Sequence, residues 1–210
     1  MTTQRRKKPA ESEPNRAQRT SEEASVRIIG GTFRGRKLLY SGDLRTRPMK
    51  DRVREALFNL VGPGIQGMHA IDLFAGTGAL GLESVSRGAA RATLIERHYP
   101  TAELIRRNVE TLGVADRCEV VAADAFLWLR RTAPSQDVSW LVLCSPPFEL
   151  YETRREAMAA LISEHIVKMP VGSTIVVETP STFDLATLPR HEGWLTRTYA
   201  PVHLAIFRKK

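Results

Sequence analysis

A glycine-rich segment follows the first long apolar run of the chain and is the clearest candidate for a ligand site. It reads DLFAGTGALG over residues 72–81, and Gly76, Gly78 and Gly81 match the spacing G-x-G-x-x-G. Glycines at a strand-to-helix turn let backbone N–H groups approach a ligand closely. Glu96 stands after the next apolar run, where an acid can bind ribose hydroxyls. A ligand that contains a ribose is therefore expected here, and the alternative is a turn that only needs small residues.

A second carboxylate follows a later apolar run. Asp124 directly precedes Ala125 and Phe126. At the carboxyl end of a parallel strand, this side chain would face the same crevice as the glycine turn and could accept a hydrogen bond from an adenine amine. An aspartate in this place also suits the cap of the helix that follows. Both interpretations stay open.

A rigid loop, Ser145-Pro146-Pro147-Phe148, follows an apolar run that ends at Cys144. Proline donates no backbone hydrogen bond, but its carbonyl still accepts one. Methyl transfer to a planar exocyclic amine needs an aromatic ring that stacks the base and acceptors that hold the N–H groups, so that the nitrogen lone pair faces the methyl donor. The loop offers both, although a plain polyproline turn is the alternative.

The elements that would position these residues alternate regularly from residue 69 onward. Apolar runs predict strands over 69–74, 92–95, 118–122, 140–144 and 174–178, and helical periodicity predicts helices over 79–86, 100–112, 125–131 and 152–167. Two further strands, 195–199 and 202–207, are so close together that they must be antiparallel. We expect an α/β fold with a doubly wound, mostly parallel, seven-stranded Rossmann-like sheet that ends in an antiparallel hairpin.

Charge divides the 210 residues into three parts. Residues 1–24 carry a net +2 and lack periodic apolar positions, residues 25–54 carry +7, and residues 55–210 carry −1. We expect a disordered tail over 1–24, a basic hairpin and helix over 25–64, with the hairpin turn at Gly30-Gly31 and the helix at 51–61, and the main α/β domain over 65–210. A local positive excess is typical of nucleic-acid binding, and a solvated basic surface is the alternative.

Composition excludes several other classes. No apolar run is long enough to cross a membrane, and the basic N-terminus has no apolar segment of the kind found in a signal peptide. Cys118 and Cys144 are the only cysteines, and the five histidines show no ligand spacing. We therefore expect a cytoplasmic protein without a metal site.

Four strings together resemble a known family. RIIGGTFRGRKL, TRPMKDRVREALFN, DLFAGTGALGLESVSRGA and the PPF loop are similar to the RsmD family of bacterial small-subunit (16S) ribosomal RNA guanine-N2 methyltransferases, and the likeness runs from about Val26 to the C-terminus. The resemblance implies a class I methyltransferase domain, S-adenosyl-L-methionine as cofactor, and small-subunit ribosomal RNA or an assembling 30S particle as partner of a monomeric enzyme.

The resemblance also implies roles for individual residues. The cofactor would be bound by Asp72, Phe74, Gly76, Thr77, Gly78, Glu96, Asp124 and Ala125. The target guanine would be held by the catalytic loop Ser145, Pro146, Pro147 and Phe148. RNA would be bound by Arg34, Arg36, Lys37, Arg47, Lys50 and Arg52, and the segment 47–54 would also cover the cofactor.

One position departs from the family pattern. Where the family reads Asp-Pro-Pro-Phe or Asp-Pro-Pro-Tyr, this chain has Ser145, whose hydroxyl accepts a hydrogen bond without a charge. We therefore expect slow but real methylation. Two other functions stay open: a nicotinamide-dependent oxidoreductase, which cofactor binding would reveal, and an RNA-binding protein with a decayed site, which would bind the cofactor without turnover.

Overall fold

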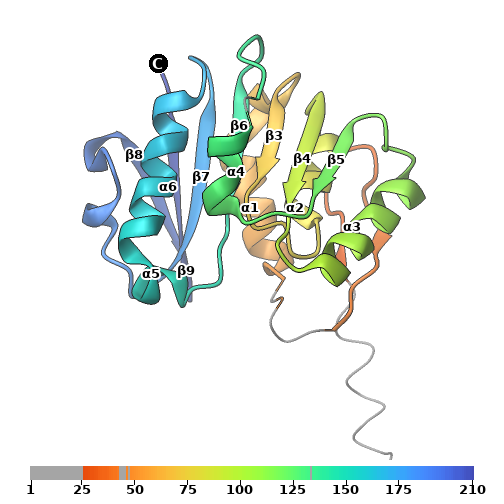
Figure 1. Cartoon of the computed structure of the whole chain (residues 1–210), viewed down its shortest axis with the longest axis horizontal. Coiled ribbons are helices and arrows are strands. Elements are labelled where there is room, and N and C mark those ends of the chain that lie inside the picture. Colours follow the sequence, from red (N-terminus) through yellow and green to blue (C-terminus); the bar gives the residue numbers. More distant parts are fainter. Residues whose placement is uncertain (1–25, 43–45, 47, 133) are drawn as a thin grey trace, which may run out of the picture.

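The computed structural model describes residues 26–42, 46, 48–132 and 134–210, so the expected tail and Arg47 lie outside the described residues. A seven-stranded sheet in the order β5-β4-β3-β6-β7-β9-β8 dominates the fold (Figure 1). Its strands are β3 (His69–Asp72), β4 (Arg91–Ile95), β5 (Cys118–Val121), β6 (Trp140–Cys144), β7 (Thr174–Pro180), β8 (Trp194–Tyr199) and β9 (Val202–Arg208). The strands from β5 to β7 are parallel, whereas β9 and β8 are antiparallel to their neighbours. The expected fold class is confirmed.

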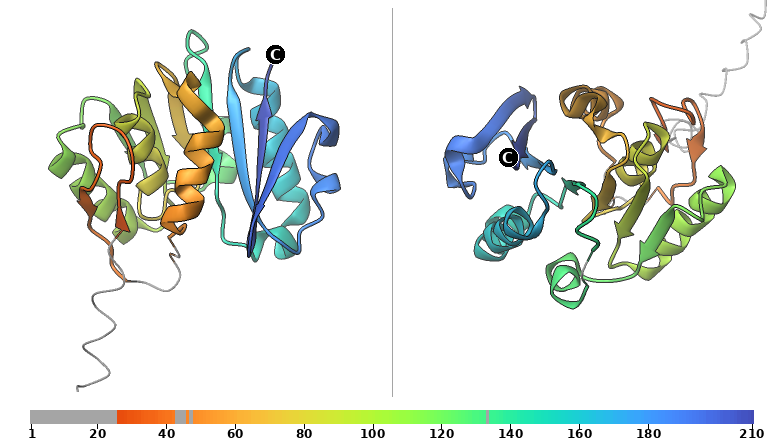
Figure 2. Two further views of the ribbon diagram at one scale, coloured as in Figure 1. Left: turned by 180° about the vertical axis from the view of Figure 1, so that it is seen from behind. Right: turned by 90° about the horizontal axis from the view of Figure 1, so that it is seen from above.

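Helices cover both faces of this sheet (Figure 2). One face carries α1 (Asp51–Val61), α2 (Ala79–Ser86) and α3 (Tyr99–Leu112), together with a small ribbon of β1 (Val26–Arg27) and β2 (Lys37–Leu38). The other face carries α4 (Ala125–Arg131), α5 (Leu150–Thr153) and α6 (Arg155–Lys168). Short 3₁₀ helices lie at Gly62–Ile65, Leu185–Thr187 and His191–Gly193. None of the helices in the described part of the chain has the length and apolar character that a membrane span needs.

The central strands are apolar throughout because both of their sides are buried. In β6, which reads WLVLC, all five residues are buried. Leu141 and Leu143 face the core under α1 and α2, while Val142 and Cys144 face the core under α6. This alternation fixes the side of the sheet on which each strand-end residue emerges.

The predicted helix over 152–167 is wrong in one respect, because it is broken into α5 and α6 at Arg154. Arg154 has a non-helical backbone, with φ −134° and ψ 38°. Its guanidinium carbon lies 3.9 Å from the centre of the Phe126 ring, a cation–π contact across elements far apart in the sequence. The spacing of apolar residues along the chain carries no information about such a contact, so the sequence did not predict the break.

The N-terminal hairpin is confirmed, but its turn is not at Gly30-Gly31. The two strands pair Val26 with Leu38, and the chain reverses between residues 32 and 35. Gly31 instead docks on the end of α2: its φ is +76°, and a Cβ there would lie 1.9 Å from the carbonyl oxygen of Ser86. Close backbone approach therefore explains the glycine.

The described part of segment 25–64 shares a core with the main domain. Val26, Leu38, Leu57 and Phe58 belong to the same buried cluster as the apolar side chains of α2 and α3. Asn108 of α3 also accepts a hydrogen bond from the Leu39 backbone N–H at 2.7 Å. The extension is therefore packed onto the sheet layer that holds the glycine turn.

Candidate active site

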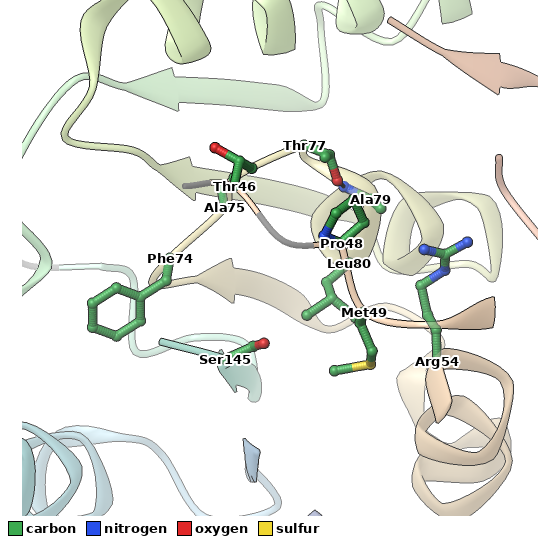
Figure 3. Close-up of a pocket in the computed structure, with 11 residues that line it drawn as sticks. Thr46, Pro48, Met49, Arg54, Phe74, Ala75, Thr77, Ala79, Leu80 and Ser145 are labelled. Atoms are coloured by element: carbon green, nitrogen blue, oxygen red, sulfur yellow. Dashed lines mark hydrogen bonds between the residues drawn. The ribbon is translucent and has the colours of Figure 1, made fainter. Parts of the chain in front are cut away.

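A crevice lies where β3 and β6 end, on the face of the sheet that carries α1 and α2 (Figure 3). The glycine turn forms its floor, the end of β6 forms one side, and the extension lies over it. The lining residues are Thr46, Pro48, Met49, Arg54, Phe74, Ala75, Gly76, Thr77, Ala79, Leu80 and Ser145. The structure therefore brings the predicted cofactor turn and Ser145, the first residue of the predicted target loop, to one crevice, whereas Pro146, Pro147 and Phe148 do not line it.

The glycine turn needs glycine at three positions for different reasons. Gly76 and Gly78 have positive φ angles of 52° and 76°, which side chains disfavour. A Cβ on Gly81 would lie 2.7 Å from the Leu94 side chain, so glycine lets α2 pack closely on the sheet. The N-terminus of α2 then faces the crevice, and backbone N–H groups there suit a polar ligand.

Glu96 holds this turn from the end of the neighbouring strand β4. Its carboxylate accepts hydrogen bonds from the Gly76 N–H at 3.0 Å and from the His98 N–H at 2.7 Å. The acid and the glycine turn predicted to bind one ligand are therefore in direct contact. Ribose binding by Glu96 stays a prediction that this placement supports.

Asp72 lies behind the turn and supports it. The side chain is fully buried, and it accepts a hydrogen bond from the Gly81 N–H at 3.0 Å. Burial raises the pKa of Asp72 from 3.8 to about 7, although the hydrogen bond from Gly81 acts in the opposite direction. Asp72 therefore orders the start of α2, and its predicted contact with the cofactor stays a prediction.

Asp124 caps α4, as one of the two interpretations of the sequence expected. Its carboxylate accepts a hydrogen bond from the Phe126 N–H at 2.8 Å. The Phe126 ring packs edge-on against Phe74, a crevice residue, with 6.0 Å between ring centres. An aromatic wall thus connects the Asp124-Ala125 turn to the crevice, while the adenine contact remains untested.

The target loop leaves β6 beside β7, and its serine is not isolated. The Ser145 hydroxyl donates a hydrogen bond to the carboxylate of Glu178, which follows Val177, the β7 partner of Cys144. Backbone carbonyls of Pro147 and Phe148 accept hydrogen bonds from the first N–H groups of α5, at 3.0 and 3.1 Å. The loop is therefore rigid. Sequence reasoning missed Glu178, although an acid at the end of the fifth predicted strand was a usable signal.

The predicted RNA-binding residues fall into two groups. Arg36 donates a hydrogen bond to the Thr111 carbonyl at the C-terminal end of α3. Because α3 connects two parallel strands, this end lies at the edge of the sheet opposite the crevice. Arg34 is exposed in the same turn of the ribbon. These two arginines are therefore remote from the target loop.

The other group lies at the edge of the crevice. Lys50 is exposed directly before α1. Arg52, in the first turn of α1, donates a hydrogen bond to the Ala200 carbonyl at 2.7 Å, in the turn between β8 and β9. Lys37 does not belong to this group, because it is exposed in β2 of the small ribbon, opposite Arg27. RNA contact by either group stays a prediction.

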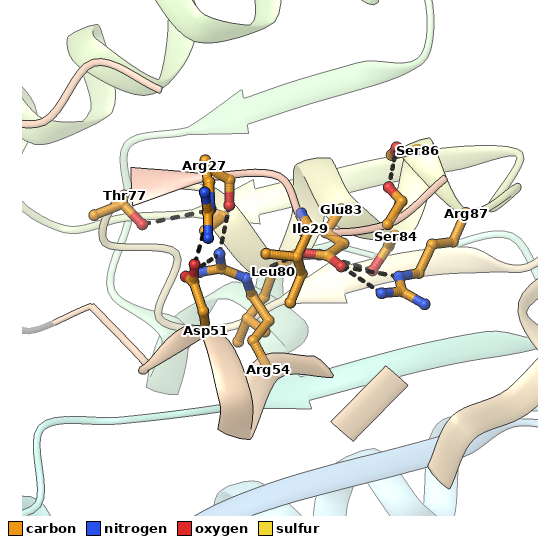
Figure 4. A network of polar contacts seen from close by, with 12 residues as sticks. Arg27, Ile29, Asp51, Arg54, Thr77, Leu80, Glu83, Ser84, Ser86 and Arg87 are labelled. Carbon is orange, nitrogen blue, oxygen red and sulfur yellow. Dashed lines mark hydrogen bonds and ion pairs between the residues drawn. The ribbon is translucent and has the colours of Figure 1, made fainter. Parts of the chain in front are cut away.

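A buried ion network fastens the extension beside the crevice (Figure 4). Arg54 of α1 contacts Glu83 of α2 at 3.0 Å, and both side chains are almost completely buried. Glu83 also accepts from Arg87 at 2.7 Å, and Arg54 pairs with Asp51 at 2.9 Å. Asp51 in turn accepts from Arg27 of β1 at 3.1 Å. Charge pairing thus joins β1, α1 and α2 into one unit.

The strand order, the antiparallel end of the sheet, the glycine turn after β3 and the acid after β4 define a class I methyltransferase fold. The chain belongs to the family described as "Conserved hypothetical protein 95", whose model matches residues 26–208, and the resemblance to the RsmD family is confirmed.

Named relatives agree with this class. One is the Bacillus subtilis protein described as "Putative rRNA methyltransferase YlbH", 30% identical over 190 residues that cover 88% of this chain and 100% of the relative. Another is the Escherichia coli ribosomal RNA small subunit methyltransferase D, 42% identical over 128 residues, which are 61% of this chain and 63% of that protein. The solved structure described as "Putative methyltransferase yhhF" from Escherichia coli is 33% identical, with a TM-score of 0.72 over 89% of this chain and 98% of that one.

Proposed function

We propose that this chain transfers a methyl group from S-adenosylmethionine to the N2 amine of a guanine in small-subunit ribosomal RNA. The observation that carries the proposal is that residues 74–77 of the glycine turn and Ser145 of the target loop line the same crevice. A methyl donor on the turn and an amine on the loop would face each other there. Family membership supports the methyltransferase class and disfavours the oxidoreductase alternative.

The residues present fit the cofactor. Gly76, which has a positive φ, leaves a cradle without a side chain, in which a Cβ would lie 3.1 Å from Thr46 above it. Glu96 would bind the ribose hydroxyls, and the turn at Asp124 and Ala125 would meet the adenine. S-adenosylmethionine supplies, when bound, an electrophilic methyl group on a sulfonium.

The target loop then orients the nucleophile. Phe148 would stack on the guanine, while the Pro146 carbonyl and the Ser145 oxygen would accept hydrogen bonds from its amine. The amine nitrogen would be the nucleophile toward the methyl carbon, with the N–C bond forming as the S–C bond breaks, and the nitrogen would lose one proton to solvent. Orientation of this kind supplies up to about 7 to 11 kcal/mol of the acceleration in well-aligned reactions.

The extension completes the proposal. Segment 25–64 would act as an RNA-binding part and as a cover for the cofactor, because Pro48 and Met49 lie over the crevice and Lys50 and Arg52 stand at its edge. We propose a monomer that acts in the cytoplasm, without a metal ion, on the RNA or on an assembling small-subunit particle.

A labelling experiment tests the function directly. The protein is incubated with labelled S-adenosylmethionine and small subunits from a strain that lacks the gene, and the label is mapped to its nucleotide and atom. Label on a guanine N2 is expected. Cofactor binding without any transfer would favour the decayed-site alternative, and binding of NAD without S-adenosylmethionine would refute the class.

Calorimetry tests the cofactor site. Glu96→Ala should weaken S-adenosylhomocysteine binding by about 1 to 3 kcal/mol, because a carboxylate that accepts hydrogen bonds is lost. Glu110→Ala, an exposed glutamate on α3, is the matched control and should leave the affinity unchanged. Equal affinities in the two variants would remove Glu96 from the cofactor site.

A further inference from the structure

A buried carboxylate stands directly behind the serine of the target loop. Strands β6 and β7 are parallel neighbours, with Cys144 opposite Val177, so Ser145 and Glu178 are the next pair along the two strands. Both side chains emerge on the face of the sheet that carries α1 and the crevice, because Cys144 and Val177 face the opposite core. Glu178 is only 7% exposed, and its carboxylate accepts a hydrogen bond from the Ser145 hydroxyl.

This hydrogen bond decides what the serine can offer to a substrate. A hydroxyl has one proton to donate and two lone pairs that accept. In Ser145 the proton is directed to Glu178, so the oxygen turns lone pairs toward the crevice that it lines. A serine that rotated freely could instead point its proton at the amine nitrogen and oppose the attack. Glu178 therefore fixes the hydroxyl as an acceptor.

The backbone of Glu178 is held as firmly as its side chain. Tyr151 of α5, six residues beyond Ser145, donates a hydrogen bond from its hydroxyl to the Glu178 carbonyl at 2.7 Å. Burial raises the pKa of the Tyr151 hydroxyl, and the negative charge of Glu178 adds to that effect. Hydrogen bonds to its side chain and to its backbone thus tie the largely buried Glu178 to the target loop and to α5.

We propose that Glu178 is a positioning residue for the target amine and supplies, through Ser145, the negative charge that an aspartate would place at position 145. The inference rests on the proposed function, because the amine to be oriented is that of the substrate. Positive charge develops on the nitrogen as the methyl group arrives, and a largely buried carboxylate one hydrogen bond away stabilises it. The motif lacks the acid, but the site does not.

A comparison in two backgrounds tests this role by single-turnover methyl transfer. Glu178→Gln keeps the shape and removes the charge, and it should lower the rate about 10- to 100-fold, since one preorganised electrostatic contact is lost. In a Ser145→Asp background the carboxylate is already at position 145, and the amide introduced by Glu178→Gln can donate a hydrogen bond to it. There, Glu178→Gln should change the rate by less than about threefold, which is strong coupling between the two positions.

Binding and stability measurements separate this role from a structural one. The Kd for S-adenosylhomocysteine and the Kd for RNA should be unchanged in every variant, and Glu156→Gln, an exposed glutamate of α6, is the matched control. Equal rate losses in both backgrounds, or a loss that follows the free energy of unfolding, would overturn the inference.

A second variant covers the case in which Glu178→Gln does not fold. Ser145→Ala keeps the acid and removes its link to the substrate, so the rate should fall by a similar factor, whereas a wild-type rate would overturn the inference. Label mapped to a different atom would refute the proposed function but leave the coupling between Ser145 and Glu178 measurable. No transfer by any of these proteins would refute both.

Discussion

Glu83→Gln removes the central acceptor of the ion network that holds the extension on the main domain. Glu83 and Arg54 are 0% and 1% exposed at their side chains, so the change leaves a buried guanidinium without its buried partner. Breaking a buried pair in this way costs about 3 to 5 kcal/mol. We expect the lower end of this range, since Arg54 keeps its contact with Asp51 at 2.9 Å.

The same network should tolerate removal of both buried charges. Burial is the largest influence on Glu83 and raises its pKa, even though Arg54 and Arg87 act to lower it. Desolvation therefore offsets much of the attraction, and apolar replacement of a buried pair is often nearly neutral. Arg54→Met combined with Glu83→Leu should accordingly cost less than Glu83→Gln alone.

Urea unfolding with linear extrapolation measures these differences. The matched control is Glu103→Gln, which breaks a half-exposed pair with Arg106 and should cost less than about 1 kcal/mol. Partial proteolysis should also cleave the extension faster in Glu83→Gln than in the control. The reasoning is refuted if Glu83→Gln costs no more than Glu103→Gln, or if the double variant costs the sum of its parts.

Two further predictions concern pH and salt. Burial raises the folded-state pKa of Asp72 to about 7, so the contribution of Asp72 to stability is full below about pH 4 and is lost as the pH rises through 7. Between about pH 5 and pH 8, the free energy of unfolding of Asp72→Asn, measured in urea, should therefore rise by about 3 kcal/mol relative to that of the wild type. A difference that stays constant with pH would contradict this prediction. Replacing Lys50 and Arg52 by glutamine, or Arg34 and Arg36 by glutamine, should each lower the log–log salt dependence of RNA binding by about 1.4. Only the first pair, at the crevice edge, should lower the single-turnover rate at saturating RNA; equal rate losses would contradict the placement.

The sequence predicted the bounds of those helices that begin at a capping residue or end at glycine and proline. Helix α1 has the predicted bounds 51–61 because Gly62 and Pro63 follow it, and α4 begins after the Asp124 cap, as expected. The break between α5 and α6 was not predictable, since it occurs where Arg154 reaches a ring on another element. The predicted position of the hairpin turn was wrong for the same reason, because Gly31 is needed for a close contact with α2 and not for a turn.

The same difference between local and long-range information separates the site residues that the sequence predicted from those that it did not. The glycine turn and Glu96 could be predicted because their types and spacing carry the information. The basic segment was predicted as one surface, yet the fold places Arg36 at the edge of the sheet opposite the crevice and Arg52 at the edge of the crevice, beside the turn between β8 and β9. Net charge along a sequence reports how much charge is present, and the path of the chain decides where it acts.

The role of position 145 shows why a motif and a site are different objects. Considered along the chain, Ser145 lacks the charge that the family pattern has there, and a slow enzyme follows. In the sheet, the neighbour that matters is thirty-three residues away, because parallel strands bring their ends together and align Ser145 with Glu178. The electrostatics of the target amine are then a property of the β6–β7 pair rather than of the loop. A substitution at 145 changes the rate of methyl transfer by an amount that depends on the residue at 178. The contribution of either position to catalysis therefore has to be measured together with that of the other.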